Sequence, residues 1–423
     1  MVSGCEKVTA ENIQKWKGTQ KGPGKLEQAF RNPKLDPRLR AEAAIALADI
    51  DLHVKVTTGF PALPEADRAQ LAAQLIPLQA ARIEKGKDAE SVAARDILYE
   101  VRASLNDEQR RQADVVLTLG VERDLRSAKE DTQSRHTVAK VATTLGPTTV
   151  GPAITKVLGD GAAPFARATA LAKTLDNQAL RDKAAAALAK RAAKQDALTP
   201  ALAKALCELG GSEAWAALQA KIRAGSETEA LVAAQALRAT TPTPEIAPAA
   251  LEAAADPKTP RAARDELFGL LEGMRGPSVA AGLVKMIARG DVDETTRFRA
   301  FQAIVVADKG PAVFGALEAF PATATYEPDA IAELLVKPIV ALGQPARQAA
   351  LSALLSTSAL ARLVAVQTLA EVGTGADASE VAKQSGDRTI LPGLPKGSTV
   401  GKEAARVAKL LKARPKEAAA ANR

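Results

Sequence analysis

The chain has 423 residues, of which 47% are apolar but only 3% aromatic, so the apolar content is mostly Ala, Leu and Val. A β-sandwich or barrel needs more aromatic and β-branched alternation, and we therefore exclude an all-β fold. The net charge of +8 lies at the ends, since residues 1–40 carry nine Lys and Arg against four Asp and Glu, and residues 383–423 carry ten against three. The slightly acidic middle argues against nucleic acid bound along it.

The N-terminal sequence Val2-Ser3-Gly4-Cys5 resembles the lipobox of bacterial lipoprotein precursors. In those precursors small residues precede a cysteine that receives a diacylglyceryl group, and Ser3 and Gly4 fill these positions. The basic start and apolar run that normally accompany a lipobox do not precede Cys5 here. The resemblance implies lipidation of Cys5 and a protein exported to the cell envelope, held at the membrane by its lipid alone. The alternative is a chance match in a cytoplasmic protein.

The first third of the chain predicts a tether followed by long helices. Residues 1–36 contain a GTQKGPG segment and are expected to form an N-terminal tether with a turn. The helical period starts after Pro37, with a first repeat helix over residues 38–50 and a loop over 54–64. Longer helices over 71–83, 91–105 and 107–127 then indicate a diverged helical region that spans residues 37–133.

Residues 198–225 form the cleanest two-helix unit of the chain. Thr199-Pro200 is typical of a helix start, and an apolar stripe that includes Leu202 and Leu206 follows until Gly210-Gly211 ends the helix. A second stripe, of Trp215, Leu218 and Ile222, predicts a second helix that ends at Gly225. Neither helix can bury its stripe alone, so such units are expected to stack.

Similar units recur from residue 134 onward at intervals of about 28 to 37 residues. Gly-Pro turns divide their helices, at Gly146-Pro147, Gly276-Pro277, Gly310-Pro311 and Gly343-Gln344-Pro345. The segments 135–146, 165–176 and especially 360–373 (LARLVAVQTLAEVG) resemble HEAT and HEAT-like repeats, in which a basic residue precedes an Ala/Leu stripe. The resemblance covers roughly residues 134–415 and implies an all-α fold, a right-handed α-α superhelix.

The HEAT resemblance also implies where a partner would bind. In that family the second helices of the units line a concave face used for protein binding. On these helices the candidate partner-binding residues are Lys156, Gln219, Arg223, Lys285 and Arg289. The alternative interpretation is that each of them is a solvated surface side chain.

The repeat array is predicted to extend over residues 134–414 and to end in a cap. Residues 385–399 interrupt the last unit before a final helix over about 402–413, and the tail 415–423 is expected to fray. An uncapped stack would expose its apolar end. We therefore expect Ile390, Leu391 and Leu394 to fold back onto the last helices.

The sequence shows no catalytic constellation. It has two histidines, His53 and His136, and neither is spaced with a Ser, Cys or second ligand as a triad or metal site requires. We therefore expect no enzymatic activity, no cofactor, no metal and no small-molecule substrate. The only other cysteine, Cys207, falls inside a predicted helix and is expected to be a packed side chain.

The leading hypothesis is a lipid-anchored, non-catalytic scaffold that binds another protein along its repeats. The alternatives are a cytosolic HEAT-like enzyme or enzyme-maturation factor of the lyase type, which would have a deep pocket with buried polar groups, and nucleic-acid binding through the basic ends. The identity of a protein partner cannot be derived from these residues.

Overall fold

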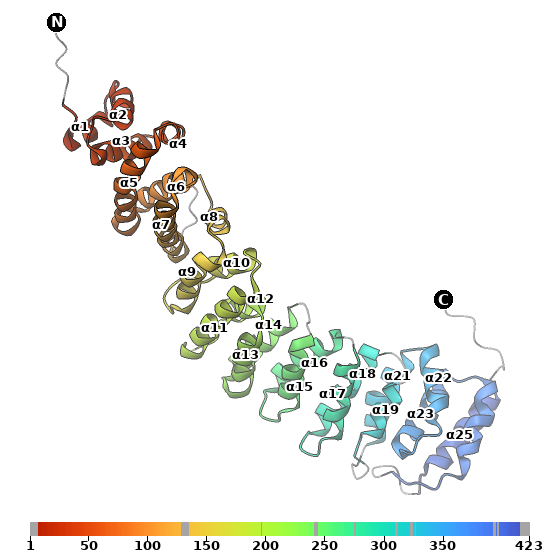
Figure 1. Cartoon of the computed structure of the whole chain (residues 1–423). Helices are drawn as coiled ribbons and strands as arrows, with labels where there is room; N and C mark the ends of the chain where they lie inside the picture. The colour runs from red at the N-terminus through yellow and green to blue at the C-terminus, as the bar shows by residue number, and fades with distance from the viewer. Residues whose placement is uncertain are drawn as a thin grey trace. The chain divides into compact units, whose positions relative to one another are not determined.

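The computed structural model describes residues 7–127, 135–195, 197–240, 244–274, 276–308, 312–321, 325, 327–391, 395 and 397–414. Over these residues every regular element is a helix (Figure 1). The chain divides into two compact units, one of residues 1–195 with 208–214 and one of residues 196–207 with 215–423. The predicted all-α helical-repeat fold is thereby confirmed.

The helices of the first unit follow one another with short connections. They are α1 (Ala10–Trp16), α2 (Gly22–Arg31), α3 (Pro37–Asp49), α4 (His53–Gly59), α5 (Glu65–Lys85), α6 (Asp88–Val101), α7 (Asp107–Arg126), α8 (Val138–Leu145), α9 (Pro147–Gly159), α10 (Ala166–Thr174) and α11 (Gln178–Lys194). Each of α3, α5, α7 and α9 packs on the odd-numbered helix that follows it. This packing between every second helix is what stacked two-helix units require.

The second unit continues the same pattern. Its helices include α14 (Glu227–Arg238), α15 (Ala247–Ala255), α16 (Arg261–Gly273), α17 (Pro277–Ala288), α18 (Glu294–Asp308), α19 (Ala312–Glu318), α20 (Pro328–Ala330), α21 (Lys337–Val340), α22 (Gln344–Ala353), α23 (Ala359–Val372), α24 (Ala378–Lys383) and α25 (Val400–Lys412). Here α14 packs on α16 and α16 on α18, while α15 packs on α17 and α17 on α19. A π-helical stretch, Ile331–Val336, joins α20 to α21.

The cleanest predicted unit corresponds to α12 (Pro200–Leu209) and α13 (Ser212–Ala224). Leu202 and Leu206 are fully buried, and Gly210 and Gly211 have φ angles of +69° and +85°, which glycine adopts without strain. Cys207 is buried, as predicted. The predicted stripe of α13 was wrong in one position, because Trp215 is half-buried while the neighbouring Ala214 is buried in its place.

The Gly-Pro turns divide the helices as predicted at three places. Gly146, Gly276 and Gly343 have positive φ angles of 83°, 144° and 69°, and each is the N-cap of the helix that follows, α9, α17 or α22. A proline without an N–H fits the first turn of each helix because that N–H would have no partner there. Gly310 and Pro311 lie outside the described residues.

Two predictions about the N-terminal part were wrong. Residues 10–31, assigned to a tether, form α1 and α2, with Ile13, Leu26 and Phe30 fully buried. The error arose because these helices are short and their polar residues outnumber the apolar ones that pack on α3. Residues 54–64 were expected to be a loop, but α4 occupies their first half and buries Val56 and Phe60.

The prediction of a cap at the C-terminal end was half right. Leu391 is buried, but Ile390 has 63% of its surface exposed and does not fold back onto the stack. Leu394 and the tail 415–423 lie outside the described residues. The final helix runs from Val400 to Lys412, and its Val407 and Leu411 are fully buried where α25 packs on α23.

Arginine side chains connect successive helices in both units. Arg191 is buried and donates hydrogen bonds to three backbone carbonyls of the loop after α9, those of Asp160, Gly161 and Ala163, at 2.7 to 2.9 Å. In the second unit Arg347 of α22 forms two hydrogen bonds of 2.7 Å with the carboxylate of Asp377. Arg191 thus satisfies loop carbonyls, and Arg347 neutralises a buried carboxylate.

Candidate partner-binding groove

Three of the residues predicted to bind a partner lie close together in the second unit. Gln219 of α13 donates a hydrogen bond of 3.0 Å to the Glu252 carboxylate on α15, and Arg223 forms an ion pair with the same carboxylate. Arg223 Nε also lies 4.0 Å from Asp256 Oδ2. The hydrogen bond from Arg223 is the main reason that the pKa of Glu252 lies below its usual value. The sequence analysis identified Gln219 and Arg223 but not the carboxylates of Glu252 and Asp256 that lie beside them.

The two predicted residues on and after α17 differ from each other. Arg289 forms hydrogen bonds of 2.6 and 3.0 Å with Asp291, which raise the pKa of its guanidinium, and the charges of Asp256 and Glu252 act in the same direction. Lys285 is exposed and forms no ion pair with any described residue. Carboxylates thus neutralise both predicted arginines, whereas no described carboxylate pairs with Lys285.

Lys156 lies on α9 of the first unit. Its ammonium is 2.8 Å from Glu122 Oε1 on α7, and Arg126 pairs with both Glu122 and Asp160. Lys156 therefore belongs to an ion-pair cluster of the first unit, formed with Glu122, Arg126 and Asp160. Cys5, the predicted lipidation site, lies outside the described residues.

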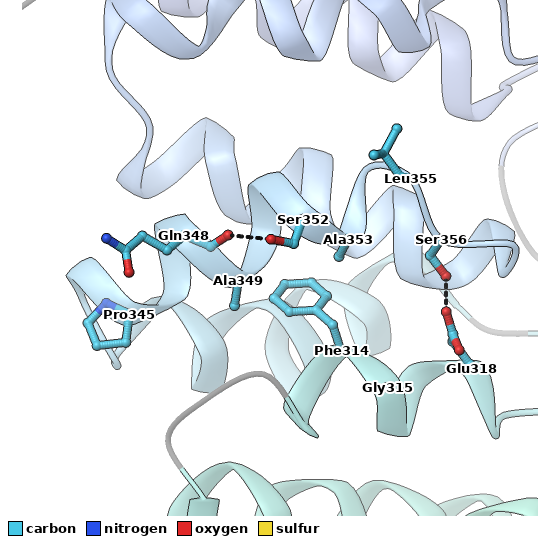
Figure 2. Close-up of a pocket in the computed structure, with 10 residues that line it drawn as sticks. All are labelled: Phe314, Gly315, Glu318, Pro345, Gln348, Ala349, Ser352, Ala353, Leu355 and Ser356. Atoms are coloured by element: carbon cyan, nitrogen blue, oxygen red, sulfur yellow. Dashed lines mark hydrogen bonds between the residues drawn. The ribbon is translucent and has the colours of Figure 1, made fainter.

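A groove in the second unit, formed by α19 and α22, offers a different kind of surface. Its volume is about 530 Å³, and its lining is mostly apolar or small (Figure 2). The lining residues are Phe314, Gly315, Glu318, Pro345, Gln348, Ala349, Ser352, Ala353, Leu355 and Ser356. We call this surface the α19–α22 groove.

The apolar part of the α19–α22 groove combines a buried ring with an exposed leucine. Figure 2 shows the Phe314 ring of α19 below Ala349 and Ala353 of α22. Leu355, in the turn directly after α22, lies at the edge of the groove with its side chain pointing away from that ring, and 84% of its surface is exposed. Of the described large apolar residues it is the most exposed. A partner that covered this leucine would remove its apolar surface from water.

The polar part of the groove has one ionisable side chain, that of Glu318. The Ser356 hydroxyl donates a hydrogen bond to Glu318 Oε1, as the dashed line in Figure 2 marks. No cation of the described residues lies within ion-pair distance of Glu318, whose second oxygen therefore remains available to a donor. The groove thus combines an apolar floor with a single negative charge at its edge.

Gly315 keeps the groove open. It is exposed within α19, and a Cβ atom at this position would meet no heavy atom within 4 Å. A larger side chain here would project into the groove without displacing a neighbour, so the position offers a way of closing the groove selectively.

The first unit has a cavity of about 640 Å³ whose lining includes Lys17, Asp49, Asp96 and Arg135. Its polar groups bind one another. Lys17 Nζ lies 2.8 Å from Asp49, and the backbone N–H of Arg135 donates a hydrogen bond of 2.8 Å to Asp96. We therefore interpret its polar groups as contacts that hold the helices of this unit together.

The histidines and acidic residues form no recognisable metal site. His136 Nε2 lies 2.9 Å from Glu100 Oε1, and its ring packs 4.6 Å from the ring of Tyr99. Within the described ranges no group of three or more His, Cys, Asp and Glu is arranged to hold a metal ion. In the same ranges no helix has the length and apolar character needed to span a bilayer.

Sequence reasoning missed the α19–α22 groove. The available signals were Phe314, one of eight phenylalanines in the chain, and a second leucine at position 355 directly after the helix-ending Leu354. Neither signal indicates a groove, because the groove depends on how two helices far apart in the sequence come together.

Comparisons with known proteins assign no family. No family model matches the chain, and no curated protein is similar to it. One solved structure, described as the crystal structure of an engineered protein, is 18% identical over 96% of this chain and 99% of that chain, with a TM-score of 0.21. Membership of the HEAT family and the lipobox therefore stay predictions.

Proposed function

We propose that this protein is a non-catalytic scaffold of stacked helices that binds another protein through the α19–α22 groove. The observation that carries the proposal is the exposure of Leu355, at 84%, beside a groove of about 530 Å³ floored by Phe314. An exposed leucine next to an apolar depression gains free energy when a partner covers both.

The size of the groove indicates what it can bind. Covering Leu355 and inserting one aliphatic side chain into the groove would contribute about 1.5 to 3 kcal/mol for each fully buried side chain. A contact this small supports weak to moderate affinity by itself and needs further contacts to become tight. The groove is thus suited to a short segment of a partner that presents one apolar anchor.

The contacts of the sequence-predicted residues make the α19–α22 groove the better candidate for binding a partner. Gln219, Arg223 and Arg289 are already engaged by carboxylates, so a partner would have to break these contacts before these side chains could bind it. The groove needs no such exchange. Attachment to a membrane through Cys5 remains part of the proposal on the strength of the lipobox-like residues before it.

A peptide selection tests the proposal. Random dodecapeptides displayed on phage would be selected on the full-length protein and then screened against Gly315→Leu, in which the new side chain occupies part of the groove. Selected peptides are expected to share a Leu, Ile or Phe anchor and to lose at least tenfold in affinity for the variant. Peptides that bind Gly315→Leu as well as the original protein would reject the groove as the binding site.

The matched control is Gly24→Leu. Gly24 is also an exposed glycine inside a helix, α2, and a Cβ atom there likewise meets nothing within 4 Å. Both substitutions replace glycine by a better helix former and are expected to leave the midpoint of thermal unfolding unchanged or slightly raised. The selected peptides should bind Gly24→Leu with unchanged affinity.

A further inference from the structure

The segment Arg388–Leu391, which precedes α25, is attached to the second unit by hydrogen bonds and by one buried side chain. The side chain of Asp387 accepts a hydrogen bond of 2.8 Å from Arg362, and the carbonyls of Asp387 and Thr389 accept backbone hydrogen bonds of 2.9 and 3.1 Å from the start of α25. Leu391 is 8% exposed. Residues 387, 389 and 391 therefore attach the segment to the body of the second unit.

The alternate residues of the same segment point outward. Ile390 is 63% exposed, and Arg388 is exposed and forms no ion pair with a described residue. The side chains of Arg388 and Ile390, two positions apart, are therefore both accessible to a partner. The segment thus presents one branched apolar side chain with one guanidinium two residues before it, on a backbone that hydrogen bonds attach to α25.

This display is complementary to the α19–α22 groove. The groove has an apolar floor at Phe314 and one carboxylate, Glu318, with no cation beside it. The segment has one apolar side chain, Ile390, and one cation, Arg388. Ile390 is not among the residues that line the groove of its own chain, so in this structure the two surfaces do not satisfy each other.

We infer that the groove binds the Arg388–Leu391 segment of a second copy of this chain, with Ile390 in the groove and Arg388 beside Glu318. The inference rests on the proposed function, since it names the occupant of the same groove. The groove and the segment are different surfaces of the chain, so each copy offers one groove and one segment. The association is therefore head-to-tail and can continue to further copies unless the rotation between copies closes a ring.

Sedimentation velocity on the full chain tests the inference. The contact is small, so self-association is expected at roughly 10 to 500 μM, where weak interfaces become populated. The average mass of the wild type should rise with concentration over this range. Raising the salt concentration should lower the mass, because the Arg388–Glu318 pair would be exposed at the edge of the contact.

Two variants separate the two surfaces. Gly315→Leu closes the groove and keeps the segment, whereas Ile390→Asp removes the apolar anchor and keeps the groove. Each alone should remain monomeric across the concentration range, while the controls Gly24→Leu and Val54→Asp, at another exposed apolar position, should behave as wild type. Circular dichroism would show that all four variants keep their helix content.

Mixing the variants gives the decisive result. An equimolar mixture of Gly315→Leu and Ile390→Asp holds one intact groove and one intact segment, so it should form a 1:1 dimer that grows no further. Association of either single variant at the wild-type level, or a mixture that stays monomeric, would overturn the inference. A wild type that stays monomeric while selected peptides still bind in a Gly315-dependent way would overturn the second-copy occupant and leave the proposed function standing.

Discussion

The carboxylate of Glu229 accepts a hydrogen bond of 3.0 Å from the backbone N–H of Leu198, 31 positions earlier in the chain. The same carboxylate caps the start of α14 through Ser226 and pairs with Lys221 at 2.7 Å. One side chain thereby connects the residues that precede α12, the end of α13 and the start of α14. It fixes both ends of the two-helix unit at residues 198–225.

Glu229 should make the free energy of unfolding depend on pH. The hydrogen bond from Lys221, followed by that from the Ser226 N–H, lowers its pKa from 4.5 to about 2. A carboxylate with a lowered pKa stabilises the folded state above its unfolded pKa, and this contribution disappears as the pH falls from about 4.5 to about 2. Glu229→Gln should cost about 1 to 3 kcal/mol at pH 7 and flatten this part of the stability profile.

The control for this prediction is Glu227→Gln on the same helical turn. Glu227 is exposed, so its substitution should change the free energy of unfolding by less than about 0.5 kcal/mol. Urea unfolding of the three proteins between pH 3 and 7 provides the comparison. Equal pH dependence for Glu229→Gln and wild type would contradict the assigned role.

The Arg347–Asp377 pair should contribute strongly to the stability of the second unit. Burial would raise the pKa of Asp377, but hydrogen bonds from Arg347 and from the Thr374 N–H outweigh it and lower the pKa. Replacing Arg347 by Leu leaves this carboxylate buried without its cation and should cost about 3 kcal/mol. Arg406→Leu removes an exposed pair with Glu403 and should cost less than about 1 kcal/mol. Thermal unfolding of both variants measures the difference, and similar losses would refute it.

The sequence-predicted cations should matter less for binding than the groove does. Substituting both Arg223 and Arg289 by Ala removes half-buried to exposed ion pairs and should cost at most about 1 kcal/mol for each pair. Titration calorimetry with a selected peptide should give the same affinity for this double variant as for wild type. A tenfold loss would move the binding site to α13, α15 and α17.

Lipid attachment at Cys5 remains a prediction with a simple test. Expressed from its complete gene in a bacterium that processes lipoproteins, the protein should partition into the membrane fraction, and its Cys5-containing peptide should carry the mass of a diacylglyceryl group. Cys5→Ser should abolish both properties. The genomic frame before Met1 should also encode a basic start and an apolar run, and the lack of such a leader would contradict the prediction.

The repeating part of the fold was predictable because its signals are local. An apolar stripe, a proline in the first helical turn and a glycine at positive φ define α12 and the starts of α9, α17 and α22. Short helices such as α1 and α4 escaped detection. Their burial depends on packing against α2, α3 and α6, which leaves little periodicity in seven residues.

The candidate site was less predictable because it depends on distant pairs. Arg223 could be identified as a basic position, but the Glu252 carboxylate that pairs with it comes from a different helix, α15. The α19–α22 groove combines residues about 40 positions apart. Ile390 was expected to be buried because of its apolar character, whereas the structure exposes it and buries the neighbouring Leu391.

Amide hydrogen exchange on the full chain, with and without a saturating selected peptide, tests the central claim most directly. If the groove is the binding site, protection should concentrate in α19, in α22 and in the turn that carries Leu355, while α13, α15 and α17 exchange as before. Protection confined to α13, α15 and α17, with α19 and α22 unchanged, would contradict the account.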